Sequence, residues 1–204
     1  MSRHAYEVSS SREIYRGRVL ALRADHVRMP GGGEAVREVV ENLGAVAVVA
    51  LDEEGRVVLV RQYRHAVRRP LWELPAGLLD VAGEPAVQTA RRELFEEAHL
   101  AAARWEVLLD LNPSPGFSDE AVRVFLARDL AAPGRERYAA EHEEADMLLE
   151  RFALDHAADM AQAGEITNAI AVAGILAAAR ARLAGWHGLR PVDAPWPDRP
   201  DPER

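Results

Sequence analysis

The chain has 204 residues, of which 49% are hydrophobic and 28% charged, and this composition excludes disorder along the whole length. Its 33 acidic residues outnumber its 25 lysines and arginines, so the net charge of −8 argues against sequence-independent binding to nucleic acid. Cysteine is absent, which excludes disulfides, thiolate metal sites and cysteine nucleophiles.

The length fits one domain with added arms. Residues 1–18 are polar and have no apolar core, so we expect no secretory signal. The longest apolar run, residues 169–179, is well short of the roughly 20 residues that a transmembrane helix needs. These features predict a cytoplasmic protein that does not enter a membrane.

The first 42 residues predict a β-rich segment. Short alternating stretches such as residues 19–23 lie on both sides of the glycine-rich turn Pro30–Gly33, a pattern typical of two or three strands. Two apolar runs follow at residues 45–51 and 57–60, joined by a short polar loop that contains glycine. They predict a β-hairpin, and because both runs are apolar throughout, its sheet should be covered on both faces.

Helices and further strands are expected downstream. A helix from Pro85 to about Leu100 is indicated by an apolar stripe at intervals of three or four residues, namely Val87, Ala90, Leu94 and Ala98. Strands are expected near residues 105–111, 121–126 and 147–152. Asp155 should cap a helix that ends near Gly164, and a last helix should span residues 166–183. The proline-rich tail from residue 191 should be extended.

Three glutamates share one face of the helix predicted from Pro85. Glu93, Glu96 and Glu97 are related by steps of three and four residues, so their side chains project together. Such a face is usually just solvated. If the carboxylates lie close together, however, like charges about 4 Å apart repel by roughly 4 kcal/mol at an effective dielectric constant of 20, and a cation is needed. Carboxylate oxygens favour Mg²⁺ or Mn²⁺, but the spacing alone leaves both interpretations open.

The sequence around this helix resembles the Nudix box, in which a glycine, a glutamate, an Arg-Glu pair and a Glu-Glu pair recur at fixed spacing. The matching residues are Gly77, Glu84, Arg92, Glu93, Leu94, Glu96, Glu97 and Leu100. Two features depart from the pattern. Six residues rather than five separate the first two matching positions, and His99 replaces the last glycine, which normally ends the helix in a left-handed conformation.

The flanking segments extend the resemblance. Residues 71–77 and 114–120 are similar to the ADP-ribose pyrophosphatase branch of the Nudix superfamily, including Pro115, which follows His99 by sixteen residues. The resemblance implies an α+β fold, an α/β/α sandwich with a mixed β-sheet between helices. It divides the chain into a β-rich dimerisation arm (1–42), a catalytic domain (43–185) and a proline-rich tail (186–204).

The resemblance also implies roles for individual residues. The expected metal ligands are Ala76 (through its carbonyl), Glu93, Glu96, Glu97 and Glu144. The expected catalytic residues are Glu97, Glu144 and Arg92, with Glu144 as ligand or general base and Arg92 orienting carboxylates. Glu143 is the alternative to Glu144. The expected substrate contacts are Arg37, Arg64, Glu73, Pro115 and Glu120, the last also an alternative base.

The implied activity is hydrolysis of the diphosphate linkage of ADP-ribose to AMP and ribose 5-phosphate. It would need Mg²⁺, with Mn²⁺ as the alternative ion, and a homodimer would carry it out on this small nucleotide-sugar substrate. Three alternatives stay open at this point: another nucleoside diphosphate derivative such as NADH, FAD or a sugar nucleotide; a module that senses ADP-ribose without cleaving it; and a scaffold that offers its acidic helix to a partner.

Overall fold

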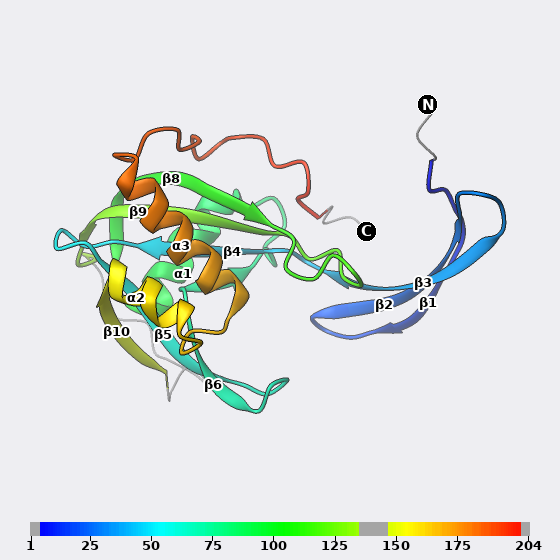
Figure 1. Ribbon diagram of the computed structural model, residues 1–204, viewed down its shortest axis with the longest axis horizontal. Coiled ribbons are helices and arrows are strands. Elements are labelled where there is room, and N and C mark those ends of the chain that lie inside the picture. Colours follow the sequence, from blue (N-terminus) through cyan, green and yellow to red (C-terminus); the bar gives the residue numbers. More distant parts are fainter. Residues whose placement is uncertain (1–4, 135–146, 201–204) are drawn as a thin grey trace. The chain divides into compact units, whose positions relative to one another are not determined.

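The computed structural model of the protein describes residues 5–134 and 147–200 (Figure 1). The strands are β1 Val8–Arg16, β2 Leu20–Arg28, β3 Glu34–Asn42, β4 Ala45–Ala50, β5 Arg56–Arg64, β6 Arg69–Glu73, β7 Ala76–Leu78, β8 Ala101–Leu111, β9 Val122–Ala131 and β10 Leu148–Ala153. The helices are α1 Ala86–Ala98, α2 Leu154–Gln162 and α3 Ala169–Leu183. Within the described residues, two compact units form, one from residues 5–44, 112–121 and 198–200 and one from the remainder.

The first unit contains the antiparallel sheet β1-β2-β3, which confirms the strands predicted around the glycine-rich turn. The loop of residues 112–121 lies along β3. The N–H of Val40 donates to the carbonyl of Phe117 at 2.7 Å, and the N–H of Asn42 donates to the carboxylate of Asp119 at 2.9 Å. Strand β1, at the edge of the sheet, exposes all nine of its residues.

The second unit has two sheets, ordered β7-β4-β9-β8 and β10-β5-β6. The first is mixed, because β4 runs parallel to β9 and antiparallel to β7. Alternate residues of β4 face opposite sides: Val46 and Val48 join the core under α1, whereas Ala47 and Val49 join the core under α2 and α3. Helices α1 and α3 therefore cover opposite faces of β4 (Figure 1).

The predicted hairpin of residues 45–51 and 57–60 is wrong. β4 and β5 belong to different sheets and are joined only by an isolated bridge between Leu51 and Val57. Each strand instead lies between two other neighbours, β7 and β9 for β4 and β10 and β6 for β5. The two apolar runs bury more surface at the centres of two covered sheets than they would as a pair.

Most helix boundaries agree with the prediction to within a few residues. His99 ends α1 with φ 51° and ψ 46°, the left-handed conformation that the motif usually assigns to glycine. Asp155 was expected to cap α2, but Ala153 holds that position and Asp155 lies in the first turn. α3 begins at Ala169 because the Asn168 side chain accepts from the N–H of Ala171 at 2.9 Å. Strands β6 and β7 were not predicted.

The proline-rich tail packs against the second unit along residues 190–197. Arg123 of β9, whose side chain is 4% exposed, pairs with Asp110 at 2.7 Å and donates to the carbonyls of Ala194 and Pro195. Its guanidinium also lies over the ring of Trp196, 4.8 Å from the centroid. The tail is thus extended, as expected, and held by a buried arginine. In the part of the chain that the structure describes, no helix is long and apolar enough to cross a membrane.

Candidate active site

Helix α1 carries its acidic residues along the border of its buried face. Its apolar stripe packs against the sheet, as predicted. Glu97 is only 8% exposed, and the side chains of Glu93 and Glu96 are 13% and 25% exposed. The helix therefore holds these carboxylates largely out of bulk water, which is uncommon for glutamate on a simple solvated face.

Gly77 of β7 lies directly against the carboxyl group of Glu93. A Cβ atom at Gly77 would lie 2.1 Å from Cδ of Glu93 and 2.2 Å from its Oε1, far inside van der Waals contact. Gly77 is paired with Val46 of β4, so the strand cannot shift away without breaking the sheet. The glycine of the motif is therefore required by this close approach.

Glu97 binds the same short strand. The backbone N–H of Ala76 donates to Oε2 of Glu97 at 3.0 Å. Ala76 is itself paired with Ala47, and the preceding carbonyl, of Pro75, accepts from the N–H of Val48 at 2.8 Å. The backbone thus fixes the Glu97 carboxylate. Metal binding by the Ala76 carbonyl stays a prediction.

Arg92 lies among four carboxylates. Its Nη1 donates to Glu93 at 2.6 Å and to Glu96 at 3.3 Å. Its Nη2 lies 3.5 Å from Oε2 of Glu84 and 3.5 Å from Oδ1 of Asp80. The planar guanidinium therefore spans two pairs of acidic groups. Sequence reasoning missed Asp80, although it lies in the segment whose length departs from the motif.

The cluster carries more negative than positive charge, since one guanidinium serves four carboxylates. Burial raises the pKa of Glu93 to about 7; Arg92 opposes this effect, and the charges of Glu96 and Asp80 add to it. A divalent cation would favour the ionised form, and carboxylate oxygens are the ligands that Mg²⁺ prefers. The donor set therefore fits such an ion.

Within residues 5–134 and 147–200, no three acidic or histidine side chains are arranged so that they could hold a metal ion. Magnesium usually binds through one or two carboxylates and completes its shell with water and substrate phosphates, so the site suits an ion that the protein holds only in part. Glu144 and Glu143 lie outside the described residues. Their roles stay predictions.

Two of the predicted substrate residues bind each other. Arg64 donates from Nε to Oε1 of Glu73 at 2.9 Å and from Nη2 to its Oε2 at 2.6 Å, and Gln62 donates to the same carboxylate at 3.4 Å. Glu73 is 3% exposed, whereas the Arg64 side chain is 44% exposed. In this arrangement Glu73 holds the arginine in place, and its contact with substrate stays a prediction.

The other three predicted substrate residues lie in the first unit. Arg37 is an exposed residue of β3, and its Nη1 donates to the carbonyl of Val36 at 2.9 Å. Pro115 and Glu120 lie in the loop that pairs with β3. Burial raises the pKa of Glu120, a property that many catalytic bases share.

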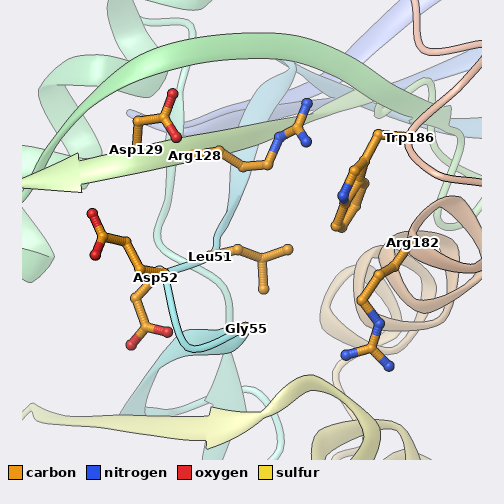
Figure 2. Close-up of a pocket in the computed structure, with 8 residues that line it drawn as sticks. Leu51, Asp52, Gly55, Arg128, Asp129, Arg182 and Trp186 are labelled. Carbon is orange, nitrogen blue, oxygen red and sulfur yellow. The ribbon is translucent and has the colours of Figure 1, made fainter.

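A separate hollow of about 240 Å³ lies beside the turn between β4 and β5 (Figure 2). Arg128 lies with its guanidinium over Trp186 and also donates to a carboxylate of β8 at 2.8 Å, while Arg182 pairs with Asp155. Asp52 lines the same space. Because both arginines are paired and acidic groups face the hollow, it is poorly suited to a diphosphate.

Comparison with known families matches residues 35–169 to the NUDIX domain and residues 6–40 to the nucleoside diphosphate sugar hydrolase N-terminal domain. The chain belongs to the NUDIX family. Of its NUDIX relatives, the ADP-ribose pyrophosphatase of Mycobacterium tuberculosis is 54% identical to it over 98% of this chain and 95% of the relative. The ADP-ribose pyrophosphatase of Bacillus subtilis is 36% identical over 77% of this chain and 83% of the relative.

A solved structure supports the NUDIX fold independently. The crystal structure of an ADP compounds hydrolase matches with a TM-score of 0.76 at 22% identity, covering 92% of this chain and 98% of the other. The predicted α+β fold with a mixed sheet between helices is thereby confirmed.

Replacing Gly77 with alanine should displace the Glu93 carboxyl group. Because that group is the end of a flexible side chain, we expect it to move while the helix stays folded. Binding of Mn²⁺, measured by electron paramagnetic resonance, should weaken by at least about 10-fold with little change in melting temperature. Gly134→Ala is the matched control, since a Cβ there meets no atom of residues 5–134 and 147–200 within 4 Å. Unchanged Mn²⁺ affinity in Gly77→Ala would contradict the close approach.

The raised pKa of Glu93 predicts a pH-dependent stability in the absence of metal. The folded state keeps a proton up to about pH 7 that the unfolded state loses near 4.5, so stability falls as the pH rises between these values. The loss amounts to at most roughly 3 kcal/mol by pH 8. We expect the unfolding free energy of the wild type in EDTA, minus that of Glu93→Gln, to decrease from pH 5.5 to pH 8. A difference that stays constant over this range would refute the burial of an ionisable Glu93.

Proposed function

We propose that this NUDIX protein hydrolyses the diphosphate linkage of ADP-ribose, with Mg²⁺, to AMP and ribose 5-phosphate in the cytoplasm. The observation that carries the proposal is its similarity, over nearly its full length, to the ADP-ribose pyrophosphatase of M. tuberculosis. The buried acidic cluster of α1 supports it, because a diphosphate needs cations to offset its charge.

The metal ions would be held by Glu93, Glu96, Glu97 and the carbonyl of Ala76, with Glu144 as a further ligand. Bound Mg²⁺ would neutralise the diphosphate and lower the pKa of a coordinated water. The N–H of Ala76 keeps Glu97 directed toward the strand, and Arg92 holds Glu93 and Glu96 in a fixed arrangement.

Other side chains would serve substrate and proton transfer. Arg64, held by the buried Glu73, offers positive charge to a phosphate. Glu144 would accept the proton of the attacking water, and Glu120 is the alternative acceptor. Water attacks one phosphorus, and the bond from that phosphorus to the bridging oxygen breaks. Arg37 and Pro115 would contact the adenosine or the diphosphate.

The protein should release AMP and ribose 5-phosphate from ADP-ribose only when Mg²⁺ is present. In ¹⁸O-labelled water, the product that carries the label identifies the phosphorus that is attacked. Glu97→Gln should reduce kcat by at least about 100-fold, because the variant loses a charge at the metal site. Its amide oxygen can still accept from the N–H of Ala76, so the melting temperature should change little.

Glu150→Gln, an exposed glutamate of β10, is the control for loss of one charge. Near-normal turnover by Glu97→Gln would refute the site. Parallel assays with NADH, FAD and a sugar nucleotide test the alternative substrates, and a higher kcat/KM on one of them would replace ADP-ribose in the proposal. Binding of ADP-ribose without turnover would indicate a sensing module.

We also propose that the protein is a homodimer paired through its N-terminal sheet. β1 is an edge strand with exposed apolar side chains, among them Ile14 and Tyr15 at 43% and 59% exposure. Such an edge is suited to association with a second copy.

Light scattering at micromolar concentration should give a mass about twice the 22.5 kDa of one chain. The double variant Ile14→Lys and Tyr15→Lys should shift this mass toward that of a monomer. Leu183→Lys, at an exposed apolar residue that ends α3, should leave the mass unchanged. A wild-type mass equal to that of one chain would refute the proposed homodimer.

A further inference from the structure

Thr89 is a fully buried hydroxyl residue near the start of α1, at 0% exposure. A helical threonine commonly bonds to a carbonyl three or four residues earlier. Here Oγ1 donates instead to Oε2 of Glu84, before the helix, at 2.7 Å. A hydrogen bond to a carboxylate is stronger than one between neutral groups, so it ties Glu84 firmly to the helix core.

The same oxygen of Glu84 faces Arg92. Nη2 of Arg92 lies 3.5 Å from it, and the Glu84 side chain is 20% exposed. Asp80, the second carboxylate on this side of the guanidinium, is 57% exposed, so solvent weakens its attraction. Glu84 is therefore the better-fixed partner of Nη2, and Thr89 helps to fix it.

The opposite side of the guanidinium contacts the acidic helix. Nη1 donates to Glu93 at 2.6 Å and to Glu96 at 3.3 Å. Because the guanidinium is planar and rigid, the position of Nη2 determines where Nη1 points. A chain of contacts thus runs from the Thr89 hydroxyl through Glu84 and Arg92 to two carboxylates.

We propose that Thr89 is a positioning residue for the metal site. Its hydroxyl anchors Glu84, Glu84 holds Arg92, and Arg92 places Glu93 and Glu96 where they can share a divalent cation. This inference rests on the proposed function for its turnover measurement, but its metal-binding measurement does not depend on the identity of the substrate.

Two substitutions at Thr89 separate positioning from packing. Thr89→Val keeps the shape and loses the hydroxyl, whereas Thr89→Ser keeps the hydroxyl and loses a buried methyl group. If Thr89 only packs, metal binding and turnover should follow the melting temperature in both variants. Ile175→Val, which removes a buried methyl group from the core under α3, is the control for that packing loss.

We expect the loss of metal binding not to follow the loss of stability across these variants. Thr89→Val should weaken Mn²⁺ binding, measured by electron paramagnetic resonance, by about 10- to 100-fold, with Thr89→Ser within about 3-fold of the wild type. Thr89→Ser and Ile175→Val should lower the melting temperature without a matching loss of Mn²⁺ binding. With ADP-ribose as substrate, the fold decrease in kcat of Thr89→Val should be larger than the fold increase in its KM. Adding Glu84→Gln to Thr89→Val should cause less further loss than Glu84→Gln causes alone, since Thr89 acts on the site through Glu84.

Equal Mn²⁺ affinity in the wild type and Thr89→Val would overturn the positioning role, even if ADP-ribose is hydrolysed. So would a loss in Thr89→Ser as large as that in Thr89→Val. If the wild type fails to hydrolyse ADP-ribose, the proposed function is contradicted, while the Mn²⁺ titrations of the same variants still decide the role of Thr89.

Discussion

The candidate site depends on how closely helix α1 lies against strand β7. Gly77 has no side chain, so the carboxyl group of Glu93 can reach the strand. One turn further along the helix, the Glu97 carboxylate accepts a hydrogen bond from the N–H of Ala76. The strand is held in turn by its pairing with β4, in the middle of the buried sheet. The acidic groups are thus positioned by backbone that the core keeps rigid, a better support for a site than a loop.

Close approach concentrates negative charge, and the charges of Glu73 and Glu93 are compensated to different degrees. Glu73 is nearly inaccessible, but a two-bond contact with Arg64 and a third bond from Gln62 compensate it. Glu93 shares its arginine with three other carboxylates, and burial raises its pKa to about 7. A fully paired acid contributes to the fold, whereas an under-compensated one lowers stability until a cation binds. This difference in charge compensation makes Glu73 a supporting residue and Glu93 a candidate metal ligand.

Elements set by local pattern were predicted well. The stripe of α1 identified both the helix and its buried face, and the left-handed His99 ends it where the motif has glycine. The pairing of strands was predicted wrongly where it depends on segments far apart in the sequence. The run of residues 45–51 has the composition of a hairpin strand, yet its partners are β7 and β9 rather than the next strand along the chain. The short strand β7 has no pattern of its own and exists because β4 pairs with it.

The sequence by itself determined the acidic face of α1, the β-rich start of the chain and the spacing that resembles the Nudix box, because helical geometry and turn chemistry act over a few residues. Only the tertiary structure decided that Gly77 faces Glu93 and that Glu73 is ion-paired with Arg64. It also placed Thr89 and Asp80 in the surroundings of Arg92. Each of these contacts joins residues whose separation in space is set by how strands and helix pack. Burial and charge compensation at one carboxylate depend on that packing, and no local pattern encodes them.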